Sequence, residues 1–314
     1  MRHKWIALLL ALVCLLGSCR GEEPEDIPAP PYCTFVDDAG QEIILQEQPQ
    51  HVAVLFSSYA EAWTLAGGTV SVTVGESVER GFADAAAVLV DDGAGKSINL
   101  EVLIAEQPDL VIASADIAAQ AEACLTLNEL GIPSAQFHVE TFSDYARLMG
   151  ILCEITEESS RYAQYVKAVE QEIAQVLDRA EQAGAGSAQK RILFVRCGSS
   201  YSATKAKTAK DNFVCGMLKE LGTYNIAENA PILLDGLSIE EILQEDPDYI
   251  FFSTMGDAEA ARDYMDAQLA SAPWQQLSAV KNGAYTYLPK ELFQYKPNAR
   301  WGEAYQYLAE LLYE

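Results

Sequence analysis

A stretch without acidic residues stands out in a strongly acidic chain. The 314 residues include 46 Asp and Glu against 21 Lys and Arg, a net charge of −25. From Gln182 to Lys210 there is no acid, and the stretch carries six cations: Lys190, Arg191, Arg196, Lys205, Lys207 and Lys210. Such a segment can recognise carboxylates or a small oxyanion. The alternative is a lysine-bearing surface loop, and the sequence leaves both open. Arg196 and Lys205 are the stronger candidates, and Lys210 suits the surface.

Two exposed acids have matched places in a repeated phrase. "NLEVLIAEQPDLVIAS" (99–114) and "SIEEILQEDPDYIFFS" (238–253) share residue types at a constant offset of 139. Asn99 and Ser238 can each cap a short helix, and S-x-x-E at Ser238 predicts a capping box. Glu101 and Glu240 then occupy the second helical position. Acids in a first helical turn favour the helix dipole by ~0.3–1 kcal/mol. The helix dipole does not require acids at matched positions in both halves, although it is a sufficient explanation for each acid alone.

The rest of each phrase predicts a helix that stops and a strand that follows. Pro108 and Pro247 end the two helices, and Asp109 and Asp248 lead into apolar runs that predict buried strands. The phrase therefore indicates one helix–strand unit present once in each half of the chain.

Signals for catalysis are weak. The chain has no G-x-S-x-G, no phosphate-binding glycine loop and no H-E-x-x-H, and only three histidines. Asp116 with Glu140 is the one acid pair that could support an extracytoplasmic metal-dependent enzyme or chelatase. His138 ends an expected strand, where a lone histidine is more often structural. We expect a binding protein without catalysis, cofactor or resident metal.

Charge and cysteine content narrow the class further. The net negative charge would repel nucleic acid. Five cysteines follow Cys19, without C-x-x-C spacing, so a zinc cluster is not expected. Cys33, Cys124, Cys153, Cys197 and Cys215 leave the connectivity open. Cys124–Cys153 and Cys197–Cys215 are the plausible disulfides, because each would join neighbouring elements of one half.

The N-terminal residues have the pattern of a signal peptide that is cleaved. Arg2, His3 and Lys4 precede an apolar run, 5–16, that ends in "LLGSC". This motif resembles the lipobox of bacterial lipoproteins, in which Cys19 becomes the lipidated first residue. The alternatives are an ordinary signal peptide or an uncleaved anchor. The Pro- and acid-rich segment after Cys19 suits an extended tether. We expect a signal peptide at 1–18 and a tether at 19–32.

Alternating short apolar runs and amphipathic stretches predict an α/β fold with parallel sheets. Expected strands in the first half are 51–56, 70–74, 88–90, 109–113 and 134–137. Expected helices there are 59–66, 100–106, 117–130 and 141–153. In the second half we expect strands at 191–196, 249–252 and 284–288, and helices at 212–221, 239–244, 258–270 and 299–313. Between the halves, the pattern predicts one long helix at 156–184, capped by Thr156 and ended by Gly184. Two α/β lobes, 33–155 and 185–314, would then be joined by a rigid helix.

This arrangement resembles a known family. The segments "PQHVAVLFSSYAEAWTLAGG", "NELGIP", "KRILFV" and "PWQQLSAVKNGAYTYLP", together with the two matched phrases, are similar in order and spacing to substrate-binding lipoproteins of ABC importers. Within these proteins, the chain resembles the group that binds ferric siderophores, haem or cobalamin. The resemblance covers residues 33–313. His51 departs from it, since the family commonly has Arg there, and so does "LAGG", which replaces the usual Leu-Gly.

The resemblance implies a partner and a place for the ligand. In the family, one acid on each lobe docks onto arginines of a permease dimer, and the matching residues are Glu101 and Glu240. Ligands in open α/β lobes bind beyond the carboxyl ends of the strands, which here means a cleft between the lobes. The candidate ligand-binding residues on those loops are Tyr59, Arg80, Phe82, Arg196, Tyr201, Lys205, Met255, Phe293, Tyr295 and Arg300. For each aromatic residue, ordinary packing is the competing explanation.

The expected function follows from these observations. The chain would be a monomeric extracytoplasmic lipoprotein, anchored at the membrane by Cys19. It would capture an anionic ligand or metal chelate of the siderophore, haem or cobalamin type and deliver it to an ABC permease and its ATPase. Besides the enzyme or chelatase, the remaining alternative is a sensor or adhesion lipoprotein that has the fold but no importer.

Overall fold

The computed structural model describes residues 30–93 and 95–313, and the signal peptide, Cys19 and most of the tether lie outside this part. Tyr32–Glu314 forms one unit. Within the described residues, no helix combines the length and the apolar character needed to cross a membrane.

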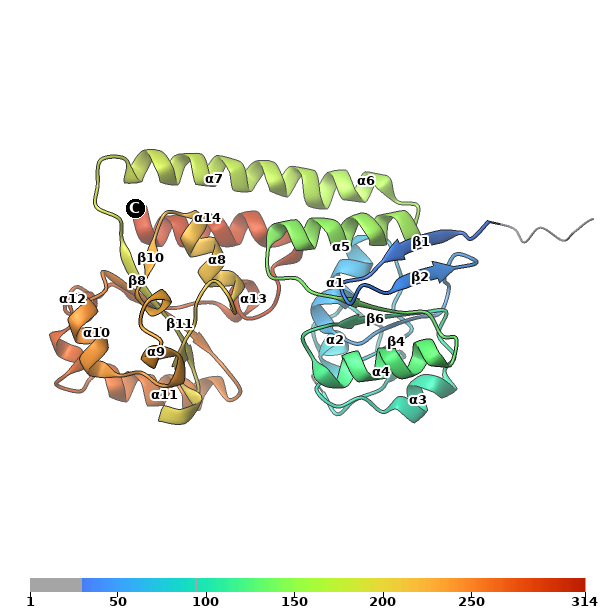
Figure 1. Ribbon diagram of the computed structural model, residues 1–314, viewed down its shortest axis with the longest axis horizontal. Coiled ribbons are helices and arrows are strands. Elements are labelled where there is room, and N and C mark those ends of the chain that lie inside the picture. Colours follow the sequence, from blue (N-terminus) through green and yellow to red (C-terminus); the bar gives the residue numbers. More distant parts are fainter. Residues whose placement is uncertain (1–29, 94, 314) are drawn as a thin grey trace, which may run out of the picture. The chain divides into compact units, whose positions relative to one another are not determined.

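The first half of the chain builds a five-stranded sheet in the order β5-β4-β3-β6-β7, with every pair parallel (Figure 1). We call this sheet with its helices the N-terminal lobe. Its strands are β3 (Val52–Val54), β4 (Val72–Thr73), β5 (Val88–Leu89), β6 (Leu110–Ser114) and β7 (Ser134–Phe137). Its helices are α1 (Ser57–Leu65), α2 (Gly75–Glu79), α3 (Leu100–Ala105), α4 (Ala118–Glu129) and α5 (Phe142–Ile155). An antiparallel hairpin, β1 (Cys33–Val36) and β2 (Glu42–Leu45), precedes the sheet and was not expected.

The second half builds the C-terminal lobe around the sheet β10-β8-β11-β12, with β9 paired antiparallel to β8. Its strands are β8 (Arg191–Cys197), β9 (Lys205–Ala206), β10 (Tyr224–Asn225), β11 (Tyr249–Thr254) and β12 (Tyr285–Tyr287). Its helices are α8 (Phe213–Glu220), α9 (Ile232–Asp235), α10 (Ile239–Glu245), α11 (Ala258–Leu269), α12 (Ser278–Lys281), α13 (Lys290–Phe293) and α14 (Trp301–Tyr313). Two mostly parallel sheets flanked by helices confirm the expected fold class.

The connection between the lobes differs in detail from the expected single helix. It comprises α6 (Ser159–Tyr162), a π-helical turn (Ala163–Lys167) and α7 (Ala168–Gly184). Gly184 ends α7 as expected. Thr156 does not cap this helix. It ends α5, and its hydroxyl donates to the carbonyl oxygen of Ala66 at 2.7 Å. The reversal occurs at Glu157, whose positive φ of 59° breaks the helical path.

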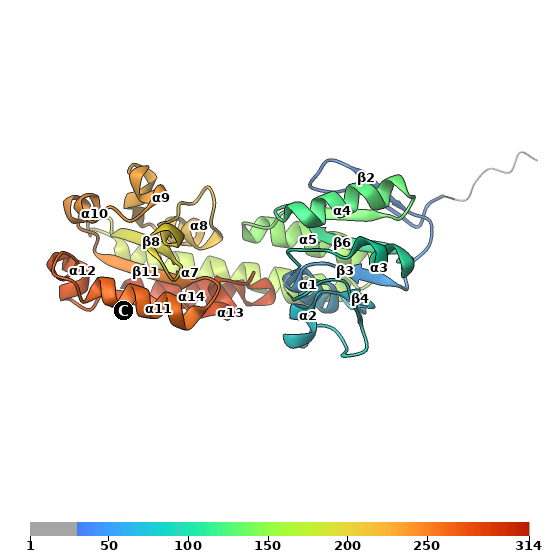
Figure 2. The same cartoon turned by 90° about the horizontal axis from the view of Figure 1, so that it is seen from below.

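One hydrophobic core belongs to both lobes. Helix α7 packs along α14, as Figures 1 and 2 show. The buried residues of these helices join those of α5 and α8 and one face of each sheet in a single cluster, with Phe194 and Phe251 contributed by the C-terminal sheet. The opposite faces of the two sheets carry separate clusters. The face that includes Phe194 is therefore the one whose packing continues into the other lobe.

The five cysteines that the structure describes are all free, which corrects the two expected disulfides. Cys124 belongs to the cluster on one face of the N-terminal sheet, and Cys153 belongs to the shared core on the other. Cys197 and Cys215 are divided in the same way by the C-terminal sheet. A disulfide needs Cα atoms within about 7 Å, and a sheet between the two thiols prevents that approach. Burial also raises the pKa of Cys124 and of Cys197 to about 12.

Candidate functional site

The clearest feature at the carboxyl end of the C-terminal sheet is a pair of cations. Arg196 is the penultimate residue of β8 and lies directly opposite Lys205 on β9 in the antiparallel register, so the two side chains share one face of the sheet. Both residues are half-buried. Among the described residues, neither side chain has an ion pair or a hydrogen bond. Like charges placed directly opposite each other destabilise a strand pair. An anion bound between them would relieve this repulsion.

Alternation of side chains along β8 explains why Arg196 and Lys205 lie on the face of the sheet that also carries the shared core. Side chains alternate along β8, so Ile192, Phe194 and Arg196 point to the same face. The first two are buried in the core that both lobes share, and Arg196 comes where that core ends. Lys205 is carried back to Arg196 by the turn 198–204. In this turn the Thr204 hydroxyl donates to the carbonyl oxygens of Gly198 and Ser200 at 3.0 and 2.8 Å.

Two neighbours complete this part of the site. Ser253 on β11 is in register with Arg196. Met255 follows the same strand, half-buried, and its backbone N–H donates to the Cys197 carbonyl oxygen at 2.8 Å. Arg196, Lys205 and Met255 are thus three expected residues that the structure places at one end of one sheet.

A second group of expected residues meets where the lobes contact each other. The Arg80 guanidinium, at the end of α2, stacks on the Tyr295 ring at 3.8 Å and lies 4.7 Å from the Phe82 ring. Its Nη1 donates to the Ser57 hydroxyl at 2.9 Å, and its Nη2 lies 3.4 Å from Oε2 of Glu61. Burial lowers the pKa of Arg80, and nearby acids, Glu61 first, oppose this shift. Arg80, Phe82 and Tyr295 therefore hold one another.

Three other expected residues have packing or surface roles. Tyr59 is 1% exposed, and its hydroxyl donates to the Phe137 carbonyl oxygen at 2.9 Å. Phe293 is also 1% exposed and packs on Tyr307. Neither side chain presents a face to a ligand in this conformation, because each lies in the shared core. Arg300 is exposed and forms a two-point ion pair with Glu303, at 2.6 and 2.7 Å.

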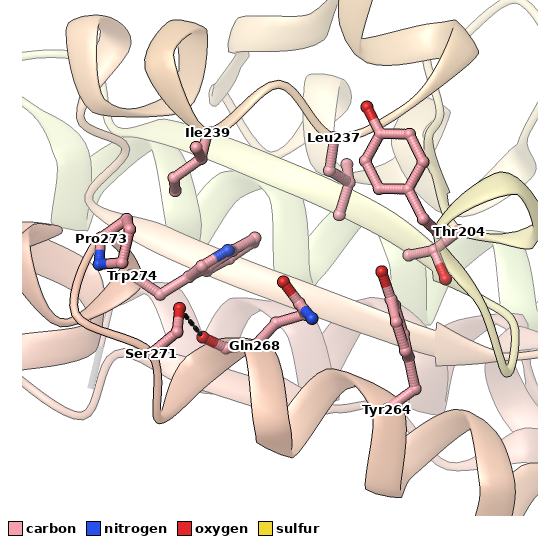
Figure 3. Close-up of a pocket in the computed structure, with 9 residues that line it drawn as sticks. Thr204, Leu237, Ile239, Tyr264, Gln268, Ser271, Pro273 and Trp274 are labelled. Atoms are coloured by element: carbon pink, nitrogen blue, oxygen red, sulfur yellow. Dashed lines mark hydrogen bonds between the residues drawn. The ribbon is translucent and has the colours of Figure 1, made fainter.

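Tyr201 lies apart from the cation pair. It is 58% exposed and lines a pocket of 170 Å³ with Thr204, Leu237, Ile239, Tyr264, Gln268 and Trp274 (Figure 3). Leu237 and Trp274 belong to the cluster on the sheet face opposite Phe194. Pockets for drug-sized ligands span about 300–1,000 Å³, so this one is too small for a siderophore or haem.

The N-terminal lobe presents acids where the C-terminal lobe presents cations. Asp116 follows β6, and its Oδ1 lies 2.6 Å from Nδ1 of His138, which follows β7. Glu140 comes two residues later, and its Oε1 accepts a hydrogen bond from Nζ of Lys296 at 2.8 Å. Asp116 and Glu140 therefore pair with different cations and do not form the acid pair that the enzyme alternative required. The part of the chain that the structure describes holds no cluster of three metal-binding side chains.

Several of these residues were not identified from the sequence. Lys296 and Asn298 belong to an expected ligand loop, but nothing in "KPN" indicates that their partners are Ser58, Glu61 and Glu140, over 150 residues earlier. The Asp116–His138 pair had a weak signal, since both residues directly follow neighbouring parallel strands.

The matched acids occupy the expected positions. Glu101 and Glu240 are exposed in the first turns of α3 and α10. Oδ1 of Asn99 caps α3 by accepting the Val102 N–H at 3.2 Å, and Oγ of Ser238 accepts the Glu241 N–H at 3.5 Å. Among the described residues, the expected capping box forms only its serine half.

Comparison with known proteins identifies the family. The family model described as "Periplasmic binding protein" matches residues 52–292. The chain therefore belongs to this family, whose members bind substrates outside the cytoplasm and are not enzymes. A search of curated proteins found no match.

Solved structures show the same fold. SirA of Staphylococcus aureus, in complex with staphyloferrin B, is 17% identical with a TM-score of 0.67, over 90% of this chain and 97% of SirA. The periplasmic haem-binding protein RhuT from Roseiflexus sp. RS-1, in apo form, is 17% identical with a TM-score of 0.67, over 84% of this chain and 98% of RhuT. A periplasmic binding protein from Veillonella parvula DSM 2008 is 15% identical with a TM-score of 0.69, over 90% of both chains. At such identities, the likeness shows the fold.

Proposed function

We propose that this chain is a lipid-anchored substrate-binding protein that captures an anionic metal chelate and delivers it to an ABC permease. The unpaired cations Arg196 and Lys205 are the observation that carries the proposal. Two cations on one strand pair, half-buried in a chain of net charge −25, favour a ligand with several carboxylates. The structural likeness to SirA, a staphyloferrin B complex, supports a carboxylate-bearing ferric siderophore as the ligand.

The remaining features assign roles to other parts of the chain. Cys19 would carry the lipid, and residues 19–32 would form the tether. Glu101 and Glu240, exposed on separate lobes, would register a two-fold permease through its arginines. Met255 would contact the chelate beside Arg196. Arg80, Phe82 and Tyr295 would border the ligand space rather than bind the carboxylates, because they are occupied with one another.

A titration of the full chain with a ferric hydroxycarboxylate siderophore, followed by intrinsic fluorescence or calorimetry, tests the ligand. Arg196→Ala and Lys205→Ala should each weaken binding by about 10- to 100-fold, since hydrogen bonds to charged groups contribute about 1.5–3 kcal/mol. Lys210→Ala is the matched control, because Lys210 lies in the same acid-free segment but is exposed. Equal affinities for all four proteins would contradict the proposal.

Cobalamin serves as a discriminating ligand in the same assay. It offers no cluster of carboxylates to the cation pair, so we expect weak binding that Arg196→Ala leaves unchanged. Tight cobalamin binding, together with no siderophore binding, would reassign the ligand class.

Haem is the second candidate, and the Asp116–His138 pair favours it. When Nδ1 of His138 donates to Asp116, the neutral ring has its lone pair on Nε2, and the side chain is 48% exposed. Such a histidine can ligate iron, and Arg196 and Lys205 would then hold the propionates. Haem added to the full chain should give a shifted Soret band that His138→Ala removes. A spectrum unaffected by this substitution would exclude His138 as the ligand.

A further inference from the structure

The contact between the lobes is polar and involves a short segment of the C-terminal lobe. The Asn298 side chain is 1% exposed, and its Nδ2 donates to the Ser58 carbonyl oxygen at 2.7 Å and to Oε2 of Glu61 at 2.9 Å. The Lys296 backbone N–H donates to the Ser58 hydroxyl at 3.3 Å. These contacts join residues about 240 positions apart. We call the residues Ser58, Glu61, Arg80, Glu140, Tyr295, Lys296 and Asn298 the interlobe seam.

Two charged contacts extend the seam on either side of Asn298. Arg80 stacks on Tyr295, and Nζ of Lys296 binds Oε1 of Glu140 while lying 5.0 Å from the Phe213 ring. The Lys296 and Glu140 side chains are 12% and 31% exposed. The Arg80–Tyr295 and Lys296–Glu140 contacts each have one partner from each lobe, whereas the Lys296–Phe213 contact lies within the C-terminal lobe. The seam therefore depends on how the lobes are placed, whereas contacts inside a sheet do not.

The seam shows signs of strain and incomplete pairing. Asn298 adopts a positive φ of 51°, a conformation that asparagine tolerates better than most residues and that glycine adopts without steric cost. Across the described residues, the buried side-chain polar atoms without a hydrogen-bond partner are Oε2 of Glu140 and Nε1 of Trp301. Glu140 belongs to the seam, and Trp301 lies next to it, because Trp301 packs on Phe213, the ring that Nζ of Lys296 approaches. Unpaired buried groups are costly, so this contact is less stable than one in which every buried polar atom is paired.

We propose that the interlobe seam is a latch that holds the two lobes at a fixed angle and opens as a unit. Asn298 and Lys296 supply the C-terminal side, and Ser58, Glu61 and Glu140 supply the N-terminal side. Opening breaks the contacts between lobes and leaves each sheet intact. The shared core along α7 and α14 still connects the lobes when the latch is open.

Hydrogen exchange of the full chain, followed by mass spectrometry of peptides, tests the latch through its reciprocity. Glu140→Gln on the N-terminal side should speed exchange in residues 294–300 across the seam. Lys296→Met and Asn298→Gly on the C-terminal side should speed exchange in α1 and in residues 138–142. We expect changes of about five- to tenfold, the factor that the loss of one net hydrogen bond gives.

The variants are chosen to limit side effects. Methionine keeps the Lys296 stem against Phe213, and glycine accepts the positive φ of Asn298. Lys167→Met is the matched control, because it removes an exposed ion pair with Glu170 that lies away from the seam. Small-angle X-ray scattering of the same proteins should show a larger radius of gyration in the seam variants alone.

Two results would overturn the latch. In the first, exchange changes only on the substituted side, which means that the contacts act locally. In the second, strands β6 and β11 lose protection together with the seam, which means that the seam supports folding of the lobes. Neither measurement requires a ligand, so a failure of the latch is distinguishable from a failure of the proposed function.

Discussion

Both lobes contain the same helix–strand unit, but they differ in the segment that follows the first strand of each sheet. In both lobes a short helix, α3 or α10, precedes a buried strand, β6 or β11, that pairs in parallel with the first strand of its sheet. After β3 the chain enters α1, which carries the half-buried Glu61. After β8 it enters an acid-free loop that carries Lys205. The same scaffold therefore presents acids on one lobe and cations on the other, because the loops beyond the strands set the chemistry.

The likeness of the units extends to backbone details. Gln107 and Asp246, offset by 139, both adopt positive φ, of 49° and 39°. Asp109 and Asp248 share the offset, and each carboxylate accepts a backbone N–H at the start of the neighbouring strand. Oδ2 of Asp109 binds the N–H groups of Gln50 and His51, and Oδ2 of Asp248 binds that of Arg191. The repeat is therefore a repeat of hydrogen bonds as well as of residue types.

The largest expected effect concerns the exposed acids that the lobes have in common. Charge reversal at Glu101 or Glu240 should reduce ligand uptake by cells by tenfold or more, since each lobe would supply half of a two-fold docking surface. Ligand affinity of the isolated protein should be nearly unchanged. Uptake assays with Glu122→Arg and Glu259→Arg as controls measure this, because these acids are also exposed, one on each lobe. A parallel loss of ligand binding would refute the docking role.

The next prediction tests whether the repeated aspartates act alike. Asp109→Ala should lower the free energy of unfolding by about 1–2 kcal/mol, because Asp109 accepts two backbone N–H groups. Asp248→Ala should cost about 1 kcal/mol, because Asp248 accepts one. Denaturant unfolding measures both, and the Asn substitutions, which keep an acceptor oxygen, should retain most of the stability. A larger loss at Asp248 would break the parallel between the lobes.

The next prediction concerns Glu61 of the N-terminal lobe. Burial raises the pKa of its carboxyl above 4.5, and the hydrogen bond from Asn298 and the charge of Arg80 oppose this shift. A raised folded pKa means that the native state favours the protonated form, so stability from this group is lost as pH rises through that pKa. Glu61→Gln resembles the protonated form and should be more stable than the wild type at pH 7. The difference should shrink as pH falls toward 4.5. Unfolding midpoints across this range check the sign, and a difference that grows on acidification would contradict it.

The smallest expected effect concerns the two matched residues with positive φ, Gln107 and Asp246. Gln107→Gly should stabilise the chain by up to about 1 kcal/mol, because glycine adopts positive φ without steric cost. Asp246→Gly should not stabilise it, because the Asp246 carboxylate accepts the Ser278 N–H and hydroxyl at 2.8 and 2.6 Å. Thermal unfolding compares the two variants. Equal gains would show that the Ser278 contacts contribute nothing.

The sequence predicts the α/β class, the two matched units and most strand positions, since those depend on local periodicity and on capping residues. Val52–Val54, Leu110–Ser114 and Tyr249–Thr254 all fall where alternating apolar runs predict them. It also singled out the acid-free segment, because composition is visible without a fold. The short β9 and β10 escaped prediction because they lie outside apolar runs, whereas the equally short β4 and β5 fall within the predicted runs 70–74 and 88–90.

The tertiary structure sets which candidate residues meet. It places Arg196 opposite Lys205 through the register of β8 and β9, and it buries Tyr59 and Phe293 in the shared core. It also separated the cysteines by placing a sheet between them. The interlobe seam depends on the tertiary structure most, because Ser58 and Asn298 meet where α1 contacts the turn Asn298–Arg300, and no local pattern records a contact between residues 240 positions apart.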